Sequence, residues 1–294
     1  MKVKHAPVAG RRPPESHGSA ALLGPVYALG SDEAERERLG RQSVELRDRS
    51  ARLLDRVALG PGQTAIDLGC GPRGVIDLLS ERVGPRGQVV GLDLDPTNVA
   101  LARSYVNDRG LANVTVVEGD ARRSGLADAT FDVVHARTVL VNVPDPAAVL
   151  TEMVRLTRPG GWVAVMEPDL GLTLFHPPHP VWDRVLETFV KVIQAEGADP
   201  FVGRRLPHLL RDAGLTQVEV ESRADVAPSG DSRRTVLVDL LRVVRAKAVA
   251  SGIASDAELD DLDRAARRHL ADPDTLAVPH LLFLAWGRKP MAGG

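Results

Sequence analysis

Between residues 64 and 168 the sequence alternates short apolar runs with helix-like segments, and this alternation constrains the fold more than any other feature. The apolar runs are continuous, which is typical of strands that are covered on both faces of a sheet. Regular alternation of such strands with helices predicts a doubly wound, mostly parallel α/β sheet. The expected strands cover 64–69, 87–93, 113–119, 131–136 and 161–168, and the expected helices between them cover 74–83, 96–109 and 146–157.

Two further strand-like runs, 216–222 and 280–288, bring the predicted sheet to seven strands and make it Rossmann-like. Other segments read as helices that such a sheet does not require. Ligands of these folds bind outside the carboxyl ends of the strands. We therefore expect the extra helices to form a helical cap there, with packing against the sheet or a homodimer contact as the alternatives. The extra helices are expected at 31–58, 180–197, 233–252 and 256–272.

The chain has 294 residues, 44% of them hydrophobic, which is enough for one large domain or a domain with a cap. We divide it into four parts by composition and pattern. These are a flexible N-terminal arm (1–20), an N-terminal helical segment (21–60), a ligand-binding Rossmann-like core (61–170), and the rest of the sheet (171–294) with cap insertions at about 178–200 and 230–272.

Charge and composition argue against several classes of partner. The net charge of −2 indicates no global basic field for nucleic acid or a membrane surface. The apolar runs are shorter than the ~20 residues that a transmembrane helix needs. A single cysteine, Cys70, excludes an internal disulfide framework, and the N-terminus lacks the apolar core of a signal peptide. We expect a cytoplasmic protein that binds neither nucleic acid nor a membrane.

The segment 65–74, AIDLGCGPRG, follows the first expected strand, and its last six residues spell the dinucleotide-binding pattern G-x-G-x-x-G. In a dinucleotide site the backbone N–H groups of this loop bind a pyrophosphate. Pro72 lies inside the loop and has no N–H to offer. The carboxylate of Asp67 would face the phosphate charges. Both residues count against a diphosphate ligand, although a nicotinamide-dependent (NAD) oxidoreductase stays the alternative.

A ligand with an ammonium and a sulfonium group fits the same loop better. Asp67 can accept hydrogen bonds from the ammonium, directly or through water. Gly69 and Gly71 allow the backbone to approach the ligand closely. S-adenosylmethionine is such a ligand.

The residues DLGCGPRG resemble motif I, D/E-x-G-x-G-x-G, of the class I S-adenosylmethionine-dependent methyltransferases, although Arg73 precedes the last glycine. The segments FDVVHARTVLVNVPDP (131–146) and LTRPGGWVAVMEP (156–168) resemble two further segments of that family, with Asn142 in place of a frequent histidine. The resemblance covers about 60–170. The overall pattern is similar to the small-molecule group that includes ubiquinone/menaquinone-type and natural-product methyltransferases.

This resemblance implies S-adenosylmethionine as the cofactor and a set of residues that contact it. An acid at the end of the second strand, Asp93, suits the ribose hydroxyls of any adenosine ligand. The family pattern places the adenine amino group on Asp120. The remaining expected cofactor contacts are Asp67, Gly69, Cys70, Gly71, Leu94, Ala121, His135, Ala136 and Arg137, together with Tyr27 and Gln42 from the N-terminal segment.

Methyl transfer from a sulfonium is an in-line displacement, so the enzyme must chiefly position the nucleophile. A base is needed only if that nucleophile must lose a proton. Glu167 at the end of the fifth strand is one candidate base, with a loop-anchoring acid as the alternative. His176 and His179 on the following loop are the others, with ordinary surface histidines as the alternative. No spacing of ligands demands a metal.

The aromatic residues Phe175, Trp182 and Phe189 are predicted to line an apolar acceptor pocket under the cap, although a hydrophobic core predicts the same cluster. The sequence therefore predicts methylation of a small organic acceptor, natural-product or quinone-like, in secondary metabolism. A cyclase or regulatory protein that binds the cofactor without methyl transfer is a further alternative.

Overall fold

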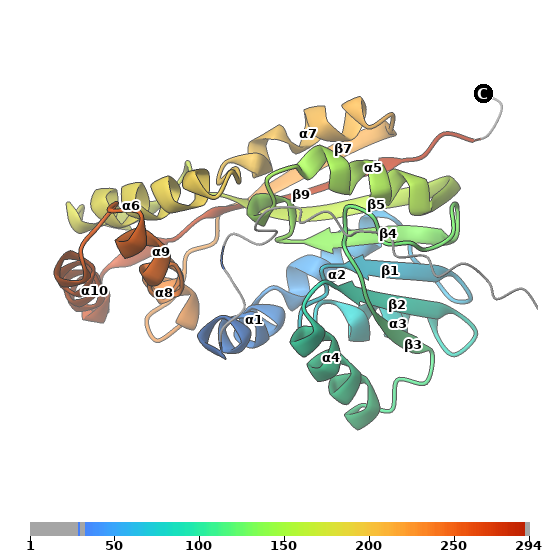
Figure 1. Ribbon diagram of the computed structural model, residues 1–294, viewed down its shortest axis with the longest axis horizontal. Coiled ribbons are helices and arrows are strands. Elements are labelled where there is room, and N and C mark those ends of the chain that lie inside the picture. Colours follow the sequence, from blue (N-terminus) through green and yellow to red (C-terminus); the bar gives the residue numbers. More distant parts are fainter. Residues whose placement is uncertain (1–28, 30–32, 292–294) are drawn as a thin grey trace, which may run out of the picture.

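The computed structural model describes residue 29 and residues 33–291, and its centre is a seven-stranded sheet with strand order β3-β2-β1-β4-β5-β9-β7 (Figure 1). The first five strands pair in parallel, whereas β9 runs antiparallel to both of its neighbours. This confirms the predicted Rossmann-like α/β fold. The strands are β1 (Thr64–Leu68), β2 (Gln88–Asp93), β3 (Val114–Glu118), β4 (Phe131–Arg137), β5 (Thr157–Asp169), β7 (Thr216–Arg223) and β9 (Leu281–Arg288).

Helices cover both faces of the sheet and enclose two hydrophobic cores. On one face lie α2 (Arg47–Arg56), α3 (Ile76–Val83) and α4 (Pro96–Asp108). On the other lie α5 (Pro146–Leu156) and α7 (Val202–Asp212). Because chain order reverses between β1 and β4, a crevice opens at their carboxyl ends, where ligands of such folds bind.

The cap has a hydrophobic core of its own and lies to the left of the sheet in Figure 1. A short antiparallel pair, β6 (Leu174–His176) with β8 (Leu276–Val278), supports it and was not predicted. Its helices are α6 (Val181–Ala195), α8 (Val236–Val243), α9 (Arg245–Ala250) and α10 (Asp256–Ala271).

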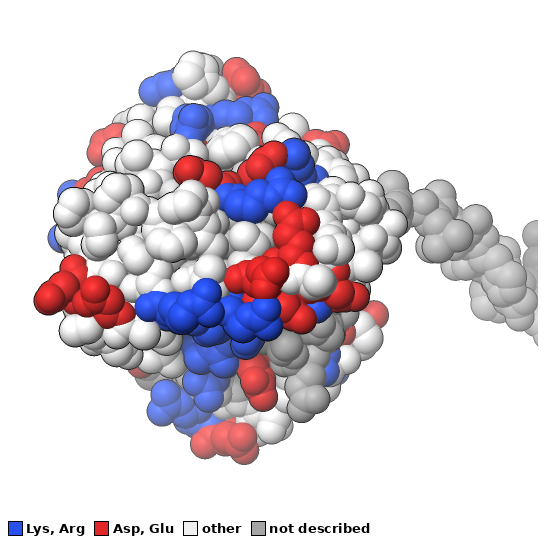
Figure 2. Space-filling model, turned by 90° about the vertical axis from the view of Figure 1, so that its left-hand side faces the viewer, with Lys and Arg blue, Asp and Glu red and all other residues white. Residues whose placement is uncertain are grey.

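Basic and acidic side chains lie side by side on the cap end of the molecule (Figure 2). Ion pairs join its helices to one another: Arg184 of α6 lies 2.6 Å from Glu258 of α10, and Arg245 of α9 lies 2.7 Å from Asp256. Among the described residues, no helix is both long and apolar enough to cross a membrane.

Two predicted helices are divided in the structure. The 31–58 segment forms α1 (Glu33–Glu45) and α2, with a break at the buried Leu46. The 233–252 segment forms the 3-10 turn η2 (Ser232–Thr235), α8 and α9. The divisions bring α1 against α8, between the core and the cap.

Candidate active site

A cavity of about 510 Å³ lies at the carboxyl ends of β1, β2, β3 and β4, covered by α1. Its size is that of a cofactor or small-molecule site. The walls are the glycine loop after β1, the segment after β2, the loop after β3 and the segment after β4. The polar side chains that line it are Gln42, Ser43, Asp67, Asp93, Asp95, Asn98, Asp120, Arg122, Arg137 and Thr138.

The glycine loop is built around the carboxylate of Asp67, which is 2% exposed. One oxygen lies 2.7 Å from Nδ1 of His135, and the other accepts the backbone N–H of Val75 at 2.9 Å. Gly74 has φ +52°, and a Cβ there would lie 2.1 Å from Oδ2 of Asp67. The last glycine of the motif therefore makes room for the acid that orders the loop.

Asp93 ties the glycine loop to the end of β2. Its Oδ2 accepts the backbone N–H of Gly71 at 2.7 Å, and its Oδ1 accepts from the N–H of Asp95 at 3.0 Å and from Nδ2 of Asn98 at 3.2 Å. Burial raises the pKa of Asp93, and these hydrogen bonds oppose the rise. The Oδ1 atom of Asn98 is buried beside the cavity without a partner among the described residues, so this wall can still bind a hydroxyl donor.

Asp120 begins the loop after β3 and forms an ion pair with Arg122, 2.7 Å away. Burial raises the pKa of Asp120, but the hydrogen bonds from Arg122 outweigh it, so the pKa lies below the ordinary value. Both side chains line the cavity. The loop after β3 thus offers the carboxylate of Asp120 as a hydrogen-bond acceptor, held in place by Arg122.

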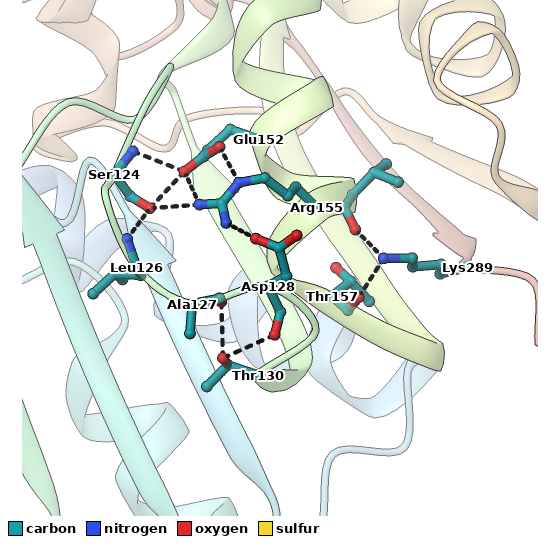
Figure 3. A network of polar contacts seen from close by, with 10 residues as sticks. Ser124, Leu126, Ala127, Asp128, Thr130, Glu152, Arg155, Thr157 and Lys289 are labelled. Atoms are coloured by element: carbon teal, nitrogen blue, oxygen red, sulfur yellow. Dashed lines mark hydrogen bonds and ion pairs between the residues drawn. The ribbon is translucent and has the colours of Figure 1, made fainter. Parts of the chain in front are cut away.

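A polar network fixes the loop that carries Asp120 onto α5 (Figure 3). Glu152 accepts from the backbone N–H of Ser124 at 2.7 Å and from Nη2 of Arg155 at 2.6 Å. Hydrogen bonds from Arg155, against the effect of burial, lower the pKa of Glu152 to about 2. Lys289 donates to the carbonyl of Thr157 at 2.7 Å in the same region.

Arg137 ends β4 with a buried guanidinium that faces the cavity. It donates to the hydroxyls of Ser50 and Ser43, each at 3.1 Å, and to the carbonyl of Gly74 at 3.2 Å. Burial lowers its pKa, and the carboxylate of Asp67 opposes this. Among the described side chains no carboxylate forms an ion pair with Arg137, so the site presents a buried cation to an anionic ligand group.

The turn after β4 is strained and is held by Glu167. Thr138 has φ +54°, a conformation that a β-branched residue rarely adopts and that costs about 1–3 kcal/mol. Glu167 accepts the backbone N–H groups of Val139 and Leu140, both at 2.9 Å, and that of Val141 at 3.2 Å. Burial raises its pKa to about 8, although these hydrogen bonds act in the opposite direction. The geometry matches the loop-anchoring alternative, and Glu167 lines neither of the cavities formed at this end of the sheet.

A second cavity of about 70 Å³ adjoins the first and shares Gln42 and Thr138 with it. Phe189 of α6 and Leu240 of α8 bring the cap to its wall, and His280 enters just before β9. The strained Thr138 therefore stands at the junction of the two cavities.

Most of the predicted cofactor residues line the larger cavity. Two do not, because His135 and Ala136 lie fully buried within β4. His135 instead contacts Asp67 from below the loop. Tyr27 lies outside the described residues. Those that line the cavity are Asp67, Gly69, Cys70, Gly71, Asp93, Leu94, Asp120, Ala121, Arg137 and Gln42.

The structure places most of the predicted acceptor-side residues elsewhere. Phe189 lines the second cavity, but Phe175 and Trp182 stack on each other in the cap core, with ring centroids 3.7 Å apart. His176 and His179 are exposed and line neither cavity, since pairing of β6 with β8 holds this segment at the base of the cap. In the described part of the chain, no cluster of three or more metal-ligating side chains forms.

Sequence reasoning missed His280 and Asn98. An antiparallel strand begins at the edge where the parallel strands end, and this rule places His280 at the ligand side of the sheet. Asn98 lies in the first turn of α4, five residues after Asp93, and its amide donates a hydrogen bond to the carboxylate of Asp93.

Comparison with known proteins identifies the family. The family described as "Methyltransferase domain" matches residues 66–165. A demethylmenaquinone methyltransferase of Geobacillus sp. (strain WCH70) is 34% identical over 181 residues, which cover 58% of this chain and 77% of that protein. The chain therefore belongs to the class I S-adenosylmethionine-dependent methyltransferases, as the sequence motifs predicted.

Two other similar proteins extend the comparison over more of the chain. An uncharacterized 37.1 kDa protein in transposon TN4556 of Streptomyces fradiae is 33% identical over 204 residues, 68% of this chain and 57% of that protein. The solved phosphoethanolamine N-methyltransferase 2 of Haemonchus contortus, in complex with S-adenosyl-L-methionine, has a TM-score of 0.54 at 21% identity, with 83% of this chain and 53% of that chain covered. The chain thus spans little more than half the length of these two proteins, and the structural match shows the fold.

Proposed function

We propose that this protein transfers a methyl group from S-adenosylmethionine in the larger cavity to a small organic acceptor in the adjoining one. The observation that carries the proposal is the junction of the two cavities at Thr138 and Gln42, beneath the cap. The proposed domain division places the cofactor in the core (61–170) and the acceptor between that core and the cap insertions.

The residues of the larger cavity fit the cofactor group by group. Asp93, with the unpartnered Oδ1 of Asn98 beside it, suits the ribose hydroxyls. The carboxylate of Asp120 suits the adenine amino group. The buried cation of Arg137 suits the carboxylate of the methionine portion, and Asp67, which lines the same cavity, suits the ammonium, directly or through water. These assignments place the methionine end next to the second cavity.

The bound cofactor would supply an electrophilic methyl group, and the chain supplies positioning. Thr138 and Gln42 border the space where an acceptor atom would approach. Phe189, Leu240 and the rest of the apolar wall exclude water from it. Glu167 acts in this scheme as a positioning residue, because it fixes the turn that carries Thr138.

The proposed acceptor is a small natural-product or quinone-like molecule of secondary metabolism. The apolar wall of the second cavity supports an acceptor with an apolar body. The name demethylmenaquinone methyltransferase, borne by a relative that is 34% identical, supports a quinone-like class.

Calorimetric titration of the full chain with S-adenosylhomocysteine, with NAD in parallel, tests the cofactor part of this proposal. We expect micromolar binding of S-adenosylhomocysteine and no heat from NAD. Transfer of labelled methyl from S-adenosylmethionine to a panel of small phenols and quinols tests the acceptor part. Binding of NAD alone, or cofactor binding without transfer to any small acceptor, would contradict the corresponding part.

A further inference from the structure

The second cavity has a charged end as well as an apolar wall. Its charged residues come from α1, α2, η2 and the segment around the end of β7, so the fold brings them together from distant parts of the sequence. Among the lining residues, arginines outnumber carboxylates by four to two. They are Arg38, Arg49, Arg223 and Arg233, with Glu45 and Asp225.

Two of these arginines retain free donors although both are paired. Arg49 donates through Nε to Asp225 at 2.8 Å and through Nη2 to the same oxygen. Arg233 donates to Asp231 through Nε at 2.9 Å and through Nη2 at 2.6 Å. In each case Nη1 makes no hydrogen bond within the described part of the chain. Each pair therefore holds a guanidinium in place with three of its five N–H donors left over, two of them on Nη1.

His280 lies at the same end of the second cavity. Its ring is partly buried and forms no hydrogen bond with any described residue. Burial, followed by the positive charges of Arg49, Arg233 and Arg38, lowers its pKa to about 4, and Asp225 opposes them. The remaining acid, Glu45, is engaged by the hydroxyl of Ser232. His280 is thus neutral near pH 7. The arginines at this end are all paired, Arg38 with Glu35, Arg49 and Arg223 with Asp225, and Arg233 with Asp231. What this end offers a ligand is therefore the N–H donors that these pairs leave over, together with the imidazole.

We propose that this end of the cavity is an anion-binding subsite, in which Arg49, Arg233 and His280 hold a carboxylate or phosphate group of the acceptor. The inference rests on the proposed function, because it assumes that the acceptor occupies the second cavity. An anionic group would receive charge-assisted hydrogen bonds from the Nη1 groups and a neutral hydrogen bond from the imidazole. The apolar wall, with Phe189 and Leu240, would take the rest of the molecule. The acceptor is therefore an apolar molecule with one anionic end.

The test uses small probes and needs no knowledge of the natural acceptor. The full chain, saturated with S-adenosylhomocysteine at pH 7, is titrated with benzoate, with phenyl phosphate and with the neutral benzamide. The Cε1 resonance of His280, assigned by its loss in His280→Gln, follows binding at the subsite. We expect benzoate or phenyl phosphate to bind about tenfold or more tightly than benzamide and to shift this resonance. The tighter of the two anions identifies the chemical group.

Substitution then locates the effect. Arg49→Gln and Arg233→Gln should each remove most of the preference for the anions, whereas Arg184→Gln, on the surface of the cap, should leave it intact. An unchanged affinity for S-adenosylhomocysteine shows that the variants are folded. Equal binding of benzamide and both anions, or a preference that survives both substitutions, would overturn the subsite. Failure of the chain to bind S-adenosylhomocysteine would instead overturn the proposed function.

Discussion

Asp93 is the residue whose loss most directly tests the placement of the cofactor. Its carboxylate lines the larger cavity and holds Gly71 at 2.7 Å. We expect Asp93→Ala to weaken binding of S-adenosylhomocysteine by about 1–3 kcal/mol, the effect of losing hydrogen bonds to a charged group. Calorimetry measures the change. Asp145→Ala is a matched control, because this acid caps α5 and lines neither cavity, and its loss should cost about 1 kcal/mol of stability. Unchanged affinity in folded Asp93→Ala would contradict the ribose assignment.

Arg137 should act on one end of the cofactor alone. If its buried guanidinium binds the carboxylate of the methionine portion, Arg137→Met will weaken the binding of S-adenosylhomocysteine by about 2 kcal/mol or more. The same variant will bind 5′-methylthioadenosine, which lacks that carboxylate, nearly as well as the unaltered protein does. Parallel titrations with both ligands make the comparison. An equal loss for both ligands would mean that Arg137 serves the fold and not the carboxylate.

Residues of the larger cavity could be predicted because they follow strands in one continuous region of sequence. Asp67, Asp93 and Asp120 each stand at a strand end, where a parallel sheet gathers its side chains. His280 and Arg49 reach the second cavity from opposite parts of the chain, and the packing of α2 against β9 in the folded core brings them together. Nothing in the local pattern around either residue marks it as a ligand-binding residue.

The turn from Thr138 to Asn142 depends on a single side chain of the neighbouring strand β5, that of Glu167. Glu167→Leu would leave the buried backbone N–H groups of Val139, Leu140 and Val141 without an acceptor, so we expect a loss of about 3 kcal/mol or more in the free energy of unfolding. Urea unfolding measures the loss. A catalytic base would behave in the opposite way, with turnover abolished and stability retained. That result would support the prediction that Glu167 is a catalytic base.

The correctly predicted strands and helices are those whose pattern lies within one short, continuous stretch of sequence. Continuous apolar runs predicted the five parallel strands within a few residues, and two further strand-like runs predicted β7 and β9. Helix α7 was missed, although Val202, Leu206 and Leu210 recur every four residues, because Pro207 interrupts the segment. The β6–β8 pair has only three residues in each strand, and its partners are about a hundred residues apart. Such a pairing depends on the cap being assembled.

The free energy of unfolding of the whole protein should fall in acid, because two groups have lowered pKa values in the folded state. The pKa of Glu152 is ordinarily 4.5 and falls to about 2 in the folded protein. Its contribution to stability is therefore present above pH 4.5 and is lost as pH falls toward 2. His280 changes from 6.5 to about 4, so it destabilises the folded state progressively as pH falls from 6.5 to 4. Glu167, with a raised pKa of about 8, acts oppositely, and its contribution declines as pH rises from 4.5 to 8.

Chemical unfolding of Glu152→Gln and of the unaltered protein across this pH range separates these effects. Because the side chain of Arg155 is partly exposed, solvent screens its ion pair with Glu152. We therefore expect the free energies of unfolding of the two proteins to differ by about 2 kcal/mol above pH 4.5, and this difference to shrink toward zero near pH 2. His280→Gln should instead flatten the slope between pH 6.5 and 4 and leave the lower range unchanged. A Glu152→Gln difference that is independent of pH would show that the network in Figure 3 stabilises the loop without its charge.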